Sequence, residues 1–307
     1  MNWTAVTAEA GRVEGVLERV RVYIELTKPR IAVLVLMTVL VGGLLASWGQ
    51  PSPWVLLWTV IGTALVAGSA SVWNQWLERD RDARMMRTRR RPIPSGRITA
   101  QESVYVSLVM LVVGLGLLAG LANYSAAVWG LLTWALYIGV YTPLKPLTSW
   151  NTAVGAVAGA LPVVIGWVAS GGELTWQMWA LFGIVFCWQF PHFMAIAWLY
   201  REDYARGGYR MMTVVDPSGR AAGMQGVVGA LFALPASLMV MLPLVDFMSA
   251  GAAVICVTGV FLAGLGQLWL ALLFLWRRDE RSARWLLRAS LIYLPLVLGL
   301  IACGPAF

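Results

Sequence analysis

The sequence predicts an all-α membrane protein, a polytopic bundle of nine transmembrane helices around an apolar cavity. Hydrophobic residues make up 59% of the 307 residues and charged residues only 12%, whereas about 25% of the residues in a soluble domain are charged. Nine apolar segments are long enough to cross a hydrocarbon core of roughly 30 Å as helices. All basic residues lie at the ends of these segments that share one side of the membrane.

The nine segments follow one another with few intervening residues. We place them near residues 31–48, 54–77, 102–122, 124–142, 151–170, 176–200, 225–245, 249–275 and 285–303. No Ser/Gly linker separates soluble domains, so we expect a polar cytoplasmic tail over residues 1–22 and one nine-helix domain over residues 23–307. Glycines at four-residue spacing would let helices approach closely in lipid. These pairs are Gly116 with Gly120 and Gly155 with Gly159.

The basic residues predict the orientation in the membrane. All 23 Lys and Arg residues precede the first segment or follow an even-numbered one. Because Lys and Arg accumulate on the cytoplasmic side, we expect a cytoplasmic N-terminus and an external C-terminus. The net charge of +8 therefore indicates topology, and we expect no nucleic-acid binding. The first twenty residues fit neither a signal peptide nor a transit peptide, which favours the cytoplasmic (inner) membrane of a prokaryote.

An acidic motif ends the second segment. Asn74, Glu78 and Asp82 are four residues apart, so a continuing helix places them on one side, whereas Asp80 points elsewhere unless the helix unwinds. Carboxylates beside hydrocarbon need a cation, and these oxygen donors suit Mg²⁺. The alternative is a solvated helix end whose acids pair with neighbouring arginines. Asn74 still lies inside the apolar segment, which favours the metal site.

Basic residues follow the acids directly. Arg87 and Arg91 carry guanidinium groups whose paired donors match phosphate oxygens, and Lys145 lies on the same side of the membrane. The arginines could also serve only as a positive-inside anchor. Their position next to the acids favours a phosphate clamp. Acids for a metal and bases for a phosphate at a membrane surface indicate a lipid diphosphate as substrate.

A second polar cluster lies in and after the sixth segment. His192, the one histidine of the sequence, follows Pro191, and Glu202 and Asp203 follow the segment's end. A lone histidine in an apolar helix is usually a structural group. Proline would break or kink the helix, and polar groups on such a helix near one membrane surface make a better site candidate.

These motifs together resemble the protohaem IX farnesyltransferases, also called haem O synthases, within the intramembrane polyprenyltransferase superfamily. The first signature is Asn74-x-x-x-Glu78-Arg79-Asp80-x-Asp82-x-x-Met85-x-Arg87-Thr88-x-x-Arg91-Pro92. The others are Leu26-Thr27-Lys28-Pro29-Arg30-Ile31, Asn151-x-x-x-Gly155-x-x-x-Gly159-Ala160-x-Pro162, Trp188-Gln189-x-Pro191-His192-Phe193 and Asp203-Tyr204-x-x-x-Gly208. The resemblance runs from about residue 23 to residue 215.

The resemblance implies transfer of a farnesyl group from farnesyl diphosphate to a vinyl group of haem b, giving haem O for terminal oxidase assembly. It implies haem-modifying or oxidase-assembly proteins as partners, besides the lipid bilayer. It assigns catalysis to Asn74, Glu78, Asp82 and Asp203, and magnesium binding to these four residues and Asp80. It assigns the diphosphate to Arg87, Arg91, Lys145 and Lys28, and the haem to His192.

Three other functions are compatible with parts of this pattern. A related enzyme could prenylate a quinone precursor such as a hydroxybenzoate, which has no iron for His192 to bind. A non-catalytic carrier of haem or lipid would need no magnesium. An ion-coupled transporter would carry acids near the middle of the membrane, but here the acids gather at segment ends.

Overall fold

The computed structural model describes residues 17–303, and nine helical segments in this range are long and apolar enough to span a membrane. They are α2 (Pro29–Ala46), α3 (Pro53–Asp82), α4 (Ala100–Leu117) with a π-helical turn (Leu118–Ala122), α5 (Tyr124–Ala135) with a π-helical turn (Leu136–Tyr141) and α6 (Thr142–Leu144), α7 (Asn151–Ala169), α8 (Trp176–Leu199), α11 (Arg220–Val245), α12 (Ala250–Arg277) and α13 (Glu280–Cys303). The described residues contain no strand. The predicted all-α class and the nine segments are confirmed.

Polar residues mark where several helices begin. The side chains of Ser52, Thr99 and Asn123 accept hydrogen bonds from backbone N–H groups of the first turns of α3, α4 and α5. Such caps satisfy donors that a helix start leaves free. α3 continues past residue 77 through Asp82, because polar side chains of its last turns pair with other segments of the protein although the apolar run has ended. α8 also runs unbroken through Pro191, so the break considered for this position is absent.

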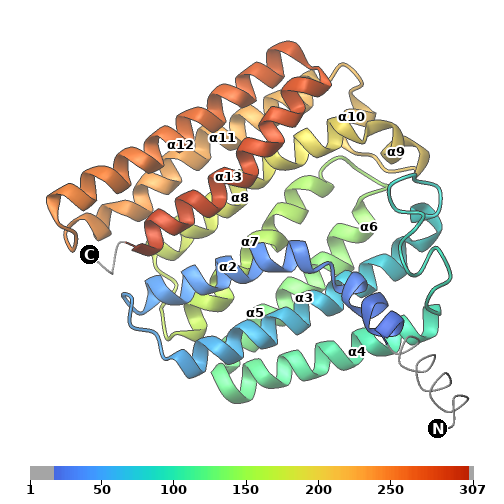
Figure 1. The fold of residues 1–307 in the computed structure, drawn as a ribbon, viewed down its shortest axis with the longest axis horizontal. Helices are drawn as coiled ribbons and strands as arrows, with labels where there is room; N and C mark the ends of the chain where they lie inside the picture. The colour runs from blue at the N-terminus through green and yellow to red at the C-terminus, as the bar shows by residue number, and fades with distance from the viewer. Residues whose placement is uncertain (1–16, 304–307) are drawn as a thin grey trace, which may run out of the picture.

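The helices form two connected halves (Figure 1). α2, α3, α4, α5 and α7 pack together, and α8, α11, α12 and α13 form the other half. α7 and α8 join the halves, and α2 also contacts α13. Two short helices, α9 (Arg201–Arg206) and α10 (Met212–Val215), lie between α8 and α11, at the end of the bundle that also holds α6 and the loop after α3.

Glycines set how closely α2 and α7 approach. A Cβ atom on Gly166 would stand 1.9 Å from the backbone oxygen of Val39, and one on Gly42 would stand 2.4 Å from that of Val163. No side chain larger than hydrogen fits at such distances, so these glycines permit contact between the two backbones. α7 is accordingly buried along most of its length.

Of the two expected glycine pairs, Gly155 with Gly159 packs against neighbouring side chains, and Gly116 with Gly120 does not. A Cβ on Gly155 would lie 2.6 Å from the ring of Tyr141, and one on Gly159 would lie 2.2 Å from the side-chain oxygen of Gln189. Around Gly116 and Gly120 no described atom lies within 4 Å of such a Cβ. The packing role predicted for Gly116 and Gly120 is wrong, because these positions face away from the neighbouring helices.

A helix over residues 17–27 precedes α2. Its Val22 and Leu26 are buried against Val72, Ile93 and Ile98, so the helix packs on α3 and the following loop. The expected boundary at residue 22 falls inside this helix, because its apolar residues are spaced to cover one face. The remainder of the predicted tail, residues 1–16, lies outside the described residues.

Candidate functional site

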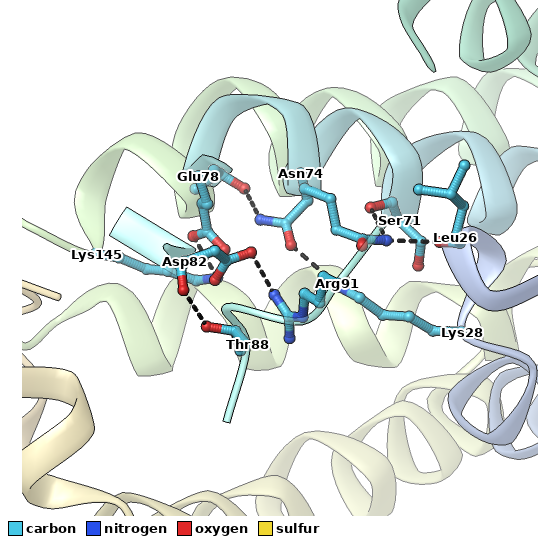
Figure 2. Close-up of polar contacts among 11 residues, drawn as sticks. Leu26, Lys28, Ser71, Asn74, Glu78, Asp82, Thr88, Arg91 and Lys145 are labelled. Atoms are coloured by element: carbon cyan, nitrogen blue, oxygen red, sulfur yellow. Dashed lines mark hydrogen bonds and ion pairs between the residues drawn. The ribbon is translucent and has the colours of Figure 1, made fainter. Parts of the chain in front are cut away.

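Three of the predicted site residues lie on one side of α3 (Figure 2). Asn74, Glu78 and Asp82 are 1%, 6% and 0% exposed, as their four-residue spacing on an unbroken helix requires. Asp80 lies two positions before Asp82 and points away from this row. Its side chain is 78% exposed, and the nearest base is Arg79 at 3.8 Å. The structure therefore does not bring Asp80 to the other predicted ligands.

Each side chain of this row contacts a basic residue from another segment. The Nζ atom of Lys145 lies 2.7 Å from Oε1 of Glu78, a guanidinium nitrogen of Arg91 lies 2.7 Å from Oδ2 of Asp82, and the Nζ atom of Lys28 donates to Oδ1 of Asn74 at 3.2 Å. Figure 2 shows the three bases reaching α3 from different directions. Buried charges are tolerated when they are paired in this way. We call these six residues the paired row.

The chain around Lys145 explains why this base reaches the row. The π-helical turn before α6 widens the helix, and Pro143 has no N–H to continue the regular pattern. Lys145 follows α6 directly, with its Nζ atom 4.6 Å from the centre of the Tyr141 ring. Burial alone would lower the pKa of Lys145, but the Glu78 carboxylate and nearby tyrosine hydroxyls raise that pKa well above its ordinary value.

Lys28 is placed by an unusual backbone conformation. It joins the helix over residues 17–27 to α2 with φ 51°, in the left-handed region that costs a non-glycine residue roughly 1–2 kcal/mol. Burial, and then the positive charges of Arg91 and Lys145, lower the pKa of Lys28 to about 7. An anion bound here would therefore relieve an unfavourable concentration of positive charge.

Asp203 on α9 holds the segment that follows α3. Its Oδ1 accepts a hydrogen bond from the backbone N–H of Met86 and its Oδ2 one from that of Arg87, each at 3.1 Å. Arg206 lies 3.6 Å from the same carboxylate. The structure thus brings Asp203 to the segment that follows Asp82, but both of its oxygens already hold that segment. Its predicted metal role stays a prediction.

Arg87 lies beside the paired row and not within it. Its guanidinium carbon is 4.9 Å from the ring centre of Tyr200 and 5.9 Å from that of Tyr204, and the residue is exposed. No ion pair joins it to an acid of the row in the described chain. Stacking on two tyrosines holds the guanidinium in place while leaving its donors accessible.

The donors of the row suit a hard divalent cation. Oδ1 of Asp82 is enclosed and has no hydrogen-bond partner, which is costly for a carboxylate oxygen unless a cation contacts it. Among residues 17–303, no three His, Cys, Asp or Glu side chains are close enough to hold one metal ion together. Magnesium usually takes one or two carboxylates together with substrate phosphate oxygens, so Glu78 and Asp82 with Asn74 fit it.

His192 lies apart from the paired row. Its Nδ1 atom is 2.9 Å from Oγ of Ser290 on α13, and its ring stacks on Trp188 with centres 4.9 Å apart. No hydrogen bond joins it to Asn74, Glu78 or another residue of the row in the described chain. The structure therefore contains two separate polar clusters, one on α3 and one between α8 and α13.

Two hollows lie elsewhere on the molecule. One, of about 290 Å³, includes Leu45, Trp167 and Glu173, and the other, of about 700 Å³, lies between α11 and α12. Neither is lined by a predicted site residue. The apolar cavity expected inside the bundle stays a prediction.

Sequence reasoning missed several residues that complete the site. Thr142 accepts a hydrogen bond from the amide of Asn74 at 3.1 Å, and Tyr141 lies beside Lys145. A single threonine carries no pattern that could have revealed this. Tyr141 could have been noticed, because it lies one helical turn before Lys145.

The described sequence and geometry match one protein family. A model of the UbiA prenyltransferase family matches residues 35–292. The chain belongs to the UbiA prenyltransferase family. The resemblance to intramembrane polyprenyltransferases that the motifs indicated is thereby confirmed, and this family member is a multi-pass membrane protein.

Curated relatives of this UbiA prenyltransferase cover nearly its whole length. A protein named protoheme IX farnesyltransferase from Rhodopirellula baltica is 42% identical, over 90% of this chain and 96% of its own. Proteins of the same name from Solibacter usitatus and Opitutus terrae are 41% and 42% identical, over 92% and 93% of this chain and 97% and 95% of their own. The sequence resemblance to this branch is confirmed.

Solved structures share the fold of this UbiA prenyltransferase. A digeranylgeranylglyceryl phosphate synthase aligns with a TM-score of 0.72 at 16% identity, covering 94% of this chain and 99% of its own. A UbiA homologue from Archaeoglobus fulgidus, bound to DMAPP and Mg²⁺, aligns with a TM-score of 0.68 at 15% identity, covering 91% of this chain and 98% of its own. At such low identity these structures establish the fold alone.

Proposed function

We propose that this protein transfers a farnesyl group from farnesyl diphosphate to a vinyl group of haem b, giving haem O for terminal oxidase assembly. The observation that carries the donor chemistry is the paired row, where three bases from other segments contact the buried Asn74, Glu78 and Asp82 at the end of α3. The relatives named protoheme IX farnesyltransferase support haem b as the acceptor.

The paired row can exchange its internal partners for a metal and a diphosphate. Asn74, Glu78 and Asp82 would hold magnesium, which when bound neutralises the diphosphate and makes it a better leaving group. Arg91, Lys145 and Lys28 would turn from these side chains to the diphosphate oxygens and stabilise the charge that grows as the C–O bond breaks. In the structure each of these bases lies within 3.2 Å of its partner among Asn74, Glu78 and Asp82.

Arg87 would add to the diphosphate site from its edge. Its guanidinium lies over Tyr200 and Tyr204, and its backbone N–H donates to Asp203, so the segment after α3 is fixed at this point. Roles of Asp80 and Asp203 as metal ligands remain predictions that magnesium titration of D80N and D203N would test. The exposed side chain of Asp80 and the occupied oxygens of Asp203 make loss of magnesium binding unexpected for both.

The neighbouring aromatic residues suit an allylic cation. Departure of the diphosphate leaves positive charge on the farnesyl group, which needs dry surroundings and electron-rich surfaces. The rings of Tyr137 and Tyr141 lie with centres 5.1 Å apart, and Tyr141 contacts Lys145. The isoprenoid chain of the substrate would lie beside these rings, inside the membrane.

The site would lie on the cytoplasmic side of the inner membrane of a prokaryote, with the N-terminus also inside. The distribution of the 23 Lys and Arg residues supports this orientation. Haem b and farnesyl diphosphate would be the small-molecule partners. Haem-modifying or oxidase-assembly proteins would receive the product.

Incubation of the purified protein with haem b, farnesyl diphosphate and magnesium tests the proposal. Mass spectrometry should find a haem carrying one farnesyl group and one added water, the hydroxyethylfarnesyl substituent of haem O. D82N should lose most of the turnover, because a carboxylate of the row is gone. S237A, altered at a buried serine on α11, is the control. Unmodified haem in this assay, together with prenylation of a hydroxybenzoate supplied in its place, would overturn the proposal, and so would D82N with the turnover of the parent.

A further inference from the structure

His192 points toward the inside of the bundle. Four residues before it, Trp188 contacts α13, and Gln189 donates to the backbone oxygen of Ala156 on α7. In helical projection, position 192 lies between positions 188 and 189, so the His192 side chain is directed between α13 and α7. α2 contacts both of these helices.

The hydrogen bonds of Ser290 determine which nitrogen of His192 carries the proton. The Ser290 hydroxyl donates to the backbone oxygen of Leu287 at 2.7 Å. With its one proton given to Leu287, this hydroxyl accepts from Nδ1 of His192, which lies 2.9 Å away, and we infer the ring tautomer from this arrangement. A neutral imidazole has one N–H, so a ring that donates through Nδ1 keeps an unprotonated Nε2.

The Nε2 atom has no competing partner. It makes no hydrogen bond within the described residues, and it is not among the enclosed polar atoms that lack one, so it retains accessible surface. The partner of the ring is a neutral hydroxyl and not an acid, which suits an uncharged imidazole in an apolar setting. An unprotonated nitrogen directed into the bundle is a ready ligand for a metal centre.

The same serine also fixes the plane of the ring. Trp188 stacks on His192 with an interplanar angle of 21°, and its indole N–H donates to the backbone oxygen of Ser290 at 2.6 Å. Ser290 thus contacts His192 through its side chain and Trp188 through its backbone. Both rotation and tautomer of the imidazole are set by one position on α13.

We propose that Ser290 is a positioning residue of the acceptor site, which holds His192 with Nε2 free to bind the iron of haem b. The proposal rests on the proposed function and adds to it how the haem is recognised. Imidazole is a common axial ligand of haem iron, and the hydrogen bond of its second nitrogen sets its orientation and basicity. If His192 had only a structural role, it would make the same hydrogen bond to Ser290 but would not bind the iron of haem b.

Nitrogen NMR tests the tautomer without haem. His192 is the one histidine in the chain, so ¹⁵N-histidine labelling of protein purified through a tag without histidine gives one ring to observe. We expect a protonated Nδ1 and an unprotonated Nε2 in the parent and in S290T, which keeps the hydroxyl. S290A should shift the ring toward the Nε2–H form. A parent ring protonated on Nε2, or an S290A ring identical to the parent's, would overturn the proposal.

Titration with ferric haem b tests the use of Nε2. Absorption and electron paramagnetic resonance spectra should show a histidine-bound iron in the parent, absent in H192A and restored there by added imidazole. S290A should bind haem about tenfold or more weakly, the usual effect of losing such a supporting hydrogen bond. The matched control S237A loses a hydrogen bond of a buried serine to Tyr293, and should keep the parent spectrum.

The two proposals fail in different ways. A histidine-bound haem that is never farnesylated would refute the proposed function and leave the role of Ser290 standing. Farnesylated haem with spectra that do not change in H192A or S290A would refute the role of Ser290 alone. Should S290A fail to fold, the parent still decides the question, because a ring protonated on Nε2, or a haem spectrum that is unchanged in H192A, would overturn the role of Ser290.

Discussion

Replacing Asp203 should release the segment after α3 from α9. The carboxylate of Asp203 accepts from two backbone N–H groups, those of Met86 and Arg87, at 3.1 Å each. A hydrogen bond to a charged acceptor contributes about 1.5–3 kcal/mol. Water can replace part of each bond at the end of the bundle, so we take the lower value. D203A then loses about 3 kcal/mol of the free energy that closes this segment, or roughly 100-fold in its open population.

Limited digestion with trypsin measures that population. The segment contains Arg84, Arg87 and Arg89 as cleavage sites, and cleavage follows the open population when opening and closing are fast. D203A should be cut roughly 100-fold faster than the parent, and D203N roughly tenfold faster, because an amide keeps one accepting oxygen.

The neighbouring acid provides the control for this experiment. Glu202 has a side chain 75% exposed and contacts Arg206 alone among the described bases, so E202Q should be cut at the parent's rate. Equal rates for D203A and E202Q would refute the role of Asp203 in closing the loop. Loss of magnesium binding in D203A without faster cleavage would instead assign Asp203 to the metal.

Three other changes should have measurable effects. E78Q leaves Lys145 buried without its partner and should lose about 3–5 kcal/mol of stability in thermal unfolding, whereas E78Q/K145Q should lose less; a double variant worse than E78Q would contradict the pairing. G166A places a Cβ 1.9 Å from the Val39 oxygen and should cost about 3 kcal/mol or more, whereas G116A should unfold like the parent. Chelating magnesium should stop farnesyl transfer, measured by mass spectrometry, without changing the haem spectrum; transfer at full rate would exclude the metal role.

Much of the fold could be predicted because lipid imposes simple rules. A span needs about 20 apolar residues, and basic residues gather on one side, so hydropathy and the Lys and Arg positions sufficed for nine segments. Helix ends were harder, since α3 extends through Asp82 and α11 begins at Arg220, beyond the apolar runs. The π-helical turns also have no signature in hydropathy.

The site could be predicted only where local spacing determines it. Four-residue spacing placed Asn74, Glu78 and Asp82 together because the helix is regular there. It could not show that the oxygens of Asp203 are occupied by backbone groups, nor that Ser290 meets His192 across 98 residues of sequence. Such contacts depend on how helices pack, and a single sequence contains no spacing that encodes them.

The acids and bases of α3 and its surroundings form one site, although their spacing suggested a metal site beside a phosphate clamp. A magnesium ion alone would draw Glu78 and Asp82 away and leave Lys145 and Arg91 as unpaired buried charges. A diphosphate alone would take the bases and leave the carboxylates unpaired. An occupant that carries both a cation and an anion would give each of these side chains a new partner, so we expect the row to bind a metal–diphosphate complex in preference to either component. This preference follows from the pairing distances and holds whichever acceptor receives the prenyl group.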